Sequence, residues 1–180
     1  GRVVPFALIR PSQFRPDAPP ALTSEAYATD VAEVAAVGSA TSTVRTVEQT
    51  EIAKYWYENT TQGWNRIARE VVAARGLDAW ESARLFALVN VAIADGFIAG
   101  FETKYHYDFW RPVTAIQEGE NDGNPLTAGD PAWQSLINNP NYPDYTSGAN
   151  NISAAMLRTM ALFFNRDRLD FEVTSNAANV

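Results

Sequence analysis

The sequence predicts an all-α protein, a helical bundle, and three observations support that prediction. Long stretches carry apolar residues at helical spacing, and most of them end at a glycine or before a proline. No pair of segments alternates apolar and polar residues as neighbouring strands do. The chain has 180 residues, 46% of them hydrophobic, with five Trp, seven Tyr and nine Phe, which is enough to fill a sizeable core.

The chain is predicted to begin with an extended arm. Residues 1–22 are rich in proline, which is excluded from the interior of a helix because it lacks the backbone N–H and its ring clashes with the preceding turn. The remaining residues, 23–180, are predicted to form one helical domain.

Each predicted helix has a local start or stop signal. In chain order, the predicted helices are 25–38 (cap at Thr23 or Ser24, stop at Gly38), 46–61 (capping box of Thr46 and Gln49), 63–76 (stop at Gly76), 78–110 (capping box of Asp78 and Glu81, with Pro112 as the latest end), 130–139 (cap at Asp130, Pro131 in the first helical position) and 147–165. A polar loop over 118–129 and a stiff, proline-containing loop over 139–148 are predicted between them.

Charge and composition exclude several classes of function. The net charge of −7 and the pI of about 4.7 argue against a nucleic acid or an anionic membrane as partner, since both require a basic surface. Cysteine is absent, which excludes disulfides and thiolate chemistry. No membrane span is predicted, because the apolar segment 85–101 contains Asp95 and two glycines and is typical of a core helix. The cellular compartment is left open, with a secreted or periplasmic location favoured.

Two short segments carry the chemistry. In "KYHYDFWRP", 104–112, seven residues separate Lys104 from Arg111, which is about 700° on a continuous helix, so both side chains are expected on one face. Arginine offers a fork of donors and lysine a point charge, a pair suited to a small anion. In "YPDYTSGAN", 142–150, Ser147 and Gly148 precede a helix, where free backbone N–H groups attract anions.

Together the two segments resemble the signatures of the vanadium-dependent haloperoxidase and acid phosphatase superfamily, in its chloroperoxidase-like branch. "KYHYDFWRP" is similar to the K-x6-RP signature, and "YPDYTSGAN" is similar to the second signature, usually P-S-G-H. The resemblance implies that Lys104, Arg111, Ser147 and Gly148 hold the oxygens of vanadate, or of phosphate in the phosphatases. Tyr142 and Phe101 fall near positions of a halide or substrate pocket, with core packing as the alternative.

The second segment departs from the family at Ala149, where the family has a histidine used in acid–base work. Alanine cannot transfer a proton, so no catalytic residue is assigned. His106 lies two positions after Lys104, about 200° around a helix, and is expected to face away from the anion. A single histidine also excludes a multi-histidine metal site, and no metal ligand is assigned. Asp108 is expected to pair with an arginine.

The third signature of the family, S-R-x5-H, is absent. After Ser147 the chain contains three arginines and no histidine: Arg158, Arg166 and Arg168. The resemblance therefore implies that the C-terminal part of the family domain is missing. An incomplete core would leave an apolar face that a second copy of the chain or the missing segment covers.

Three functions follow as hypotheses. The first is a vanadium-dependent haloperoxidase-like protein with vanadate as cofactor, acting on peroxide and halide if active. The second is an inactive scaffold that keeps the fold and binds phosphate or no group. The third, within the same class, is an acid phosphatase-like hydrolase. Because of Ala149 and the missing signature, this chain alone is expected to be weakly active or inactive.

Overall fold

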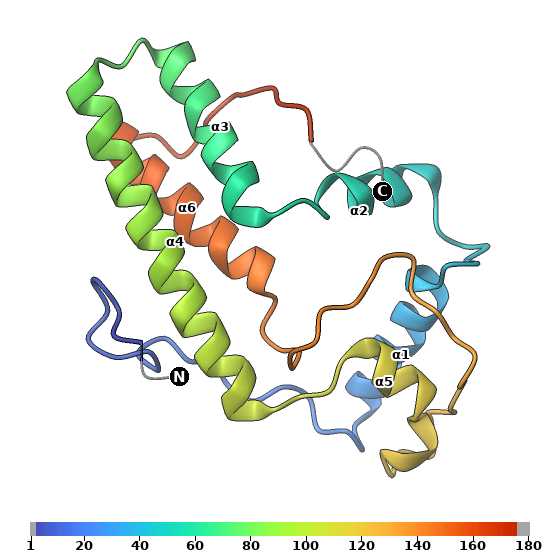
Figure 1. Ribbon diagram of the computed structural model, residues 1–180. Helices are drawn as coiled ribbons and strands as arrows, with labels where there is room; N and C mark the ends of the chain where they lie inside the picture. Colours follow the sequence, from blue (N-terminus) through green and yellow to red (C-terminus); the bar gives the residue numbers. More distant parts are fainter. Residues whose placement is uncertain (1–2, 176–180) are drawn as a thin grey trace. The chain divides into compact units, whose positions relative to one another are not determined.

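The computed structural model describes residues 3–175, and within them the regular structure is helical, which confirms the predicted class. The elements are α1 (Glu25–Gly38), α2 (Val47–Tyr55), α3 (Thr60–Arg75), α4 (Ala79–Tyr107), α5 (Pro112–Gln117), a 3-10 turn η1 (Gly119–Asn121) and α6 (Gly148–Phe164) (Figure 1). Strand-like pairing in these residues is limited to an isolated bridge between Ser39 and Ser135.

The chain packs as two compact units. Unit 1 comprises Gly1–Arg15, Lys54–Thr103 and Thr146–Val180, and unit 2 comprises Pro16–Ala53 and Lys104–Tyr145. The predicted arm is divided between them, and its described residues form bends and turns without a helix. The prediction of one helical domain after residue 22 stays a prediction.

Three of the boundary signals found in the sequence have the expected geometry. Before α2, the Gln49 N–H donates to Thr46 Oγ1 at 3.1 Å and the Thr46 N–H donates to Gln49 Oε1 at 2.9 Å. Asp78 and Glu81 form the same reciprocal pair before α4, at 2.8 and 3.1 Å. Gly76 ends α3 with φ of 64°, a left-handed conformation that costs glycine little.

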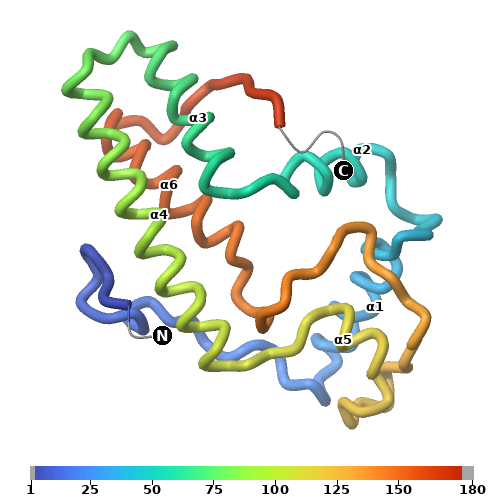
Figure 2. Tube along the Cα trace, viewed as in Figure 1, coloured from blue at the N-terminus to red at the C-terminus, as the bar shows by residue number. Residues whose placement is uncertain are grey.

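The core of unit 1 lies between α3, residues 79–103 of α4, and α6, which run beside one another (Figure 2). Its buried members are Trp64, Ile67, Ala68, Val71, Leu85, Val89, Ile93, Ile152, Met156 and Met160. The indole N–H of Trp64 donates to Ser153 Oγ at 2.8 Å, so the one polar atom of this large side chain is satisfied inside the core.

Two glycines allow α4 and α6 to approach closely. The Asn151 side chain of α6 donates from Nδ2 to the carbonyl oxygen of Gly96 at 2.7 Å. A Cβ atom on Gly100 would lie 2.9 Å from the same Nδ2 atom. The glycines in this apolar helix therefore make room for a side chain of the neighbouring helix, in agreement with the prediction of a core helix.

A buried carboxylate fixes the N-terminal arm to α4. Asp95 is 5% exposed, and its two oxygens accept hydrogen bonds from the backbone N–H groups of Phe6, Ala7 and Leu8 at 2.7, 2.7 and 3.0 Å. Burial by itself raises the pKa of Asp95, but the three amide donors outweigh it, and the pKa is lowered from its usual value. All four residues belong to unit 1.

The lowered pKa predicts that acid releases the arm. A carboxyl whose pKa is lower in the folded state stabilises above its unfolded pKa, about 3.9. That contribution is lost as the pH falls through the folded pKa. Hydrogen exchange of the backbone amides of Phe6, Ala7 and Leu8 measures this release. After correction for the intrinsic pH dependence of exchange, the protection of these amides relative to those of α3 is expected to fall at acidic pH. Asp95→Asn should lower this protection about tenfold at pH 7. Unchanged protection in that variant would contradict the anchoring role.

Unit 2 is built around α1 and α5. Tyr27 and Ile116 are buried, at 3% exposure each, and Trp133 joins them at 7%. The Trp133 indole N–H donates to the carbonyl oxygen of Ala35 in α1 at 3.0 Å. The Asn124 amide group donates to the backbone oxygens of Leu22 and Ser24 at 2.8 and 3.0 Å, which holds the chain before α1.

The predicted helix over 130–139 is wrong. The Asp130 N–H bonds to Ile116 O at 2.8 Å and the Leu136 N–H bonds to Gly38 O at 2.9 Å, so backbone groups of this segment pair with α5 and the end of α1. The capping signals of Asp130 and Pro131 lead instead into a single turn, closed by the Trp133 N–H on Asp130 O at 3.0 Å.

Helix α5 is not predicted from the sequence. Pro112 is expected only to end a helix, but it occupies the first turn of a new one. Proline is favoured there because its missing N–H would have no intrahelical partner.

Among residues 3–175, one helical segment is long and apolar enough to span a membrane by length and composition. It is Ala79–Gln117, with a mean hydropathy of 1.6 in its most apolar window. Buried core helices pass the same test, so the segment is weak evidence for a membrane, and the absence of a span stays a prediction.

Candidate functional site

The end of α4 determines where the two predicted anion ligands lie. Lys104 is in the last turn of α4, which stops at Tyr107 instead of near residue 110 as predicted. Asp108 has φ of 46°, a left-handed conformation that aspartate tolerates and that ends the helix. Arg111 is therefore outside α4, in the extended conformation typical of a residue before proline. The expected spacing of two turns on one helix is wrong for Arg111.

Both cationic side chains nevertheless reach one loop of unit 2. Arg111 Nε donates to the backbone oxygen of Tyr142 at 2.7 Å, and Lys104 Nζ donates to that of Pro143 at 3.2 Å. The Asp144 N–H in turn donates to Phe109 O at 2.8 Å. A loop conformation, and not helical periodicity, brings Lys104 and Arg111 together.

Tyr142 places its ring against both cations. Its centroid is 5.4 Å from Lys104 Nζ and 4.6 Å from Arg111 Cζ, within the range of cation–π attraction. The structure thus brings three of the predicted site residues together. The assignment of Tyr142 to a halide or substrate pocket stays a prediction.

Asp144 is the charged residue of this cluster that the sequence analysis did not single out. Its Oδ1 atom lies 3.8 Å from Lys104 Nζ and 3.9 Å from Arg111 Nη1. The side chains of Lys104, Arg111 and Asp144 are 3%, 18% and 29% exposed, so the lysine is the most deeply buried. A carboxylate oxygen shared by two cations occupies the kind of position that an oxygen of a small anion would take.

Burial and the two charged neighbours shift the pKa of Lys104. Burial lowers the pKa of its ammonium, Asp144 raises it and Arg111 lowers it, and the net result is a pKa below the usual value. Asp144 is thus the neighbour that favours the charged form of this buried lysine.

Ser147 and Gly148 lie at the start of α6, in unit 1. The Ser147 hydroxyl accepts from the Asn150 N–H at 3.3 Å, so the serine acts as the helix cap. Ala149 occupies the first turn and is exposed. Lys104 and Arg111 belong to unit 2, and a site shared by these four residues stays a prediction.

The other candidate residues take part in ring packing or in helix termination. Phe101, in unit 1, is half-buried with its ring 6.3 Å from that of Phe97, which packs against the core. The His106 ring lies 4.8 Å from that of Tyr107 at an interplanar angle of 77°. Asp108, expected to pair with an arginine, has no ion pair within residues 3–175 and instead terminates α4.

Comparisons with known proteins identify relatives of this arrangement. Residues 84–180 match the family model described as the VCPO second helical-bundle domain. The chain is 31% identical over 181 residues to the vanadium chloroperoxidase of Curvularia inaequalis, covering 82% of this chain and 29% of that protein. It also resembles the crystal structure of the first bacterial vanadium-dependent iodoperoxidase, with a TM-score of 0.74 and 26% identity, covering 89% of this chain and 39% of that one.

Proposed function

The chain belongs to the VCPO family of the vanadium haloperoxidase superfamily, and from that premise we propose that Lys104 and Arg111 form the cationic part of a binding site for a tetrahedral oxyanion, vanadate or phosphate. The chain spans 29% and 39% of the two relatives' lengths. Halide oxidation by the whole protein is therefore part of the proposal.

The proposal rests on one observation: the carboxylate of Asp144 lies close to both Lys104 and Arg111. Two cationic groups, one of them 3% exposed, lie within 3.9 Å of a single carboxylate oxygen. An anionic oxygen is thus already stabilised by this pair. An oxyanion that displaces the Asp144 carboxylate would receive the guanidinium as a planar fork of donors and the ammonium as a point charge.

The described residues suit vanadate as a charged oxyanion. Within residues 3–175 no group of three His, Cys, Asp or Glu side chains could hold a metal cation, so the donor set here is cationic. Lys104 and Arg111 would hold and orient the anion by charge and hydrogen bonds. The chemistry that vanadate supplies in this family is peroxide-dependent halide oxidation. Ser147 and Gly148 remain the predicted backbone donors.

The same contacts favour a second candidate, a non-catalytic scaffold. Asp144 supplies an internal counter-charge for both cations, and Ala149 offers no proton-transfer group. In that function the cluster holds the loop 142–144 in place and binds no anion. An acid phosphatase-like activity is the in-class alternative.

A measurement of anion binding distinguishes these candidate functions. Isothermal titration of the 180-residue chain with phosphate and with vanadate, at low ionic strength, is expected to give a dissociation constant of about micromolar to millimolar. Arg111→Ala should abolish binding, because losing one charged partner of a buried site costs about 2–5 kcal/mol. Arg158→Ala is the matched control, since that side chain is 67% exposed. Equal binding by wild type and Arg111→Ala would place the anion elsewhere, and no binding by wild type would favour the scaffold.

A further inference from the structure

The loop that carries Asp144 contains a strained residue. Tyr145, directly after Asp144, has φ of 35°, in the left-handed region. An L-residue with a bulky side chain avoids this region because its Cβ atom comes too close to the following carbonyl oxygen. Such strain persists only where the surrounding structure holds the residue in place, and it is concentrated at functional sites. The contacts of Tyr145 therefore indicate which neighbour depends on this conformation.

Two contacts hold the Tyr145 side chain, both with residues of unit 2. Its hydroxyl donates to the backbone oxygen of Asp17 at 2.7 Å. Its ring lies 5.7 Å from that of Tyr107 at an interplanar angle of 72°, a favourable edge-to-face arrangement. The Tyr107 hydroxyl donates in turn to the backbone oxygen of Pro16 at 2.7 Å. Two tyrosines thus connect the end of α4 and the loop at Asp144 to one short stretch of the arm.

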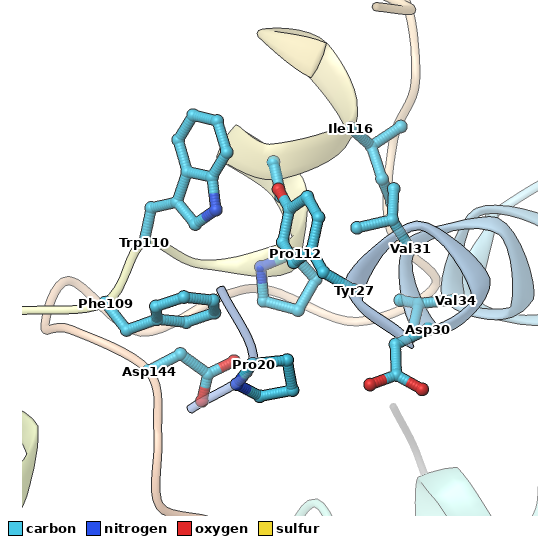
Figure 3. A pocket seen from close by; sticks show the side chains of 11 residues that line it. Pro20, Tyr27, Asp30, Val31, Val34, Phe109, Trp110, Pro112, Ile116 and Asp144 are labelled. Carbon is cyan, nitrogen blue, oxygen red and sulfur yellow. The ribbon is translucent and has the colours of Figure 1, made fainter. Parts of the chain in front are cut away.

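The position of the Asp144 carboxylate depends on the backbone that carries it. The Asp144 N–H donates to Phe109 O at 2.8 Å, and the side chain borders the apolar pocket of unit 2 together with Pro20 and Phe109 (Figure 3). The distances from Oδ1 to the two cations, 3.8 and 3.9 Å, exceed a hydrogen bond. Among the described residues, the backbone therefore keeps the carboxylate near the cations, and Tyr145 is the next residue of that backbone.

We propose that Tyr145 is a positioning residue that holds the carboxylate of Asp144 against Lys104 and Arg111, so that the cation pair keeps an internal competitor of the anion. The hydroxyl bond to Asp17 and the ring contact offset the strain of the left-handed backbone. Loss of the anchor lets Tyr145 leave that conformation and moves the carboxylate away from the cations. The competitor's role rests on the proposed function, whereas its placement can be measured without an anion.

The titration of Lys104 tests the placement. The chain has two lysines, Lys54 and Lys104, so NMR of isotope-labelled lysine side chains follows each one, with Lys54 as internal reference. Burial lowers the pKa of Lys104 and the Asp144 carboxylate raises it. Tyr145→Phe keeps the ring, removes the hydroxyl anchor and is expected to lower this pKa further, because the carboxylate moves away. Tyr57→Phe, which removes a tyrosine hydroxyl from unit 1, should leave the titration of Lys104 unchanged.

Two comparisons separate positioning from a general loss of structure. In the Asp144→Asn background, adding Tyr145→Phe should not change the titration of Lys104 further, since Tyr145 acts only through that carboxylate. Tyr145→Gly should lower the pKa of Lys104 less than Tyr145→Ala does. Both variants lose the anchor, but glycine adopts the left-handed conformation without strain and alanine does not.

Calorimetric titration with phosphate at neutral pH connects the placement to the proposed function. Tyr145→Phe is expected to bind phosphate about threefold to tenfold more tightly than the wild type, because the anion meets a weaker competitor. A lowered pKa of Lys104 without tighter phosphate binding would support the positioning role and contradict the proposed function. An unchanged titration of Lys104 in both Tyr145→Phe and Tyr145→Ala would overturn the inference. An equal shift by Tyr145→Phe in the Asp144→Asn background would also overturn it.

Discussion

Asp144→Asn is expected to tighten the binding of phosphate and vanadate by about tenfold to a hundredfold. The substitution keeps the shape of the side chain and removes the charge that competes with the anion for Lys104 and Arg111. A unit charge about 4 Å from another contributes about 4 kcal/mol at an effective dielectric constant of 20. Asp144 is 29% exposed, and solvent reduces this to about 1.4–2.8 kcal/mol, the stated change in affinity.

Calorimetric titration at several salt concentrations measures the effect, which should shrink as salt increases. Asp30→Asn is the matched control, because it changes the net charge equally and Asp30 is exposed and forms none of the ion pairs that Lys104 and Arg111 make within residues 3–175. Equal tightening in both variants would mean that only net charge matters. Weaker binding in Asp144→Asn would mean that the carboxylate supports the site instead of competing for it.

Trp64→Ala is expected to lower the free energy of unfolding of unit 1 by about 3–5 kcal/mol, because truncating a large core aromatic loses its contacts and leaves a cavity. Trp64 is 4% exposed and contacts the core of α3, α4 and α6. The variant also leaves the Ser153 hydroxyl without its indole partner.

Urea unfolding followed by circular dichroism gives the measurement, from the change in midpoint at constant slope. Trp80→Ala is the matched control, with the same chemical change at a side chain that is 86% exposed, and should cost less than about 0.5 kcal/mol. Similar losses in the two variants would contradict the position of Trp64 in the core.

Local signals account for the helices that were predicted well. The segments 25–38 and 147–165 agree with α1 and α6 to within a residue, since each begins at a serine cap and α1 reaches a glycine where expected. The failure at 130–139 has a different origin. Its backbone hydrogen bonds go to Ile116 and Gly38, partners that are distant in sequence and override the local capping signals.

The sequence predicted that the side chains of Lys104 and Arg111 meet, but not by which geometry. The structure brings both to the loop at Tyr142, and their role as anion ligands stays a prediction. Their meeting depends on the left-handed Asp108, which no helical periodicity reveals. Asp144 lies in the loop segment 142–150, but its position in the sequence does not predict that its carboxylate faces both cations.

The position of Asp144 couples the proposed anion to a proton. Burial lowers the pKa of Lys104, the Asp144 carboxylate raises it and Arg111 lowers it. Under the proposed function an oxyanion takes over this counter-charge, so the anion and the proton on Lys104 favour each other, and linkage requires that each raises the affinity of the other by the same factor. Oxyanion binding would then weaken as the pH rises through the pKa of Lys104.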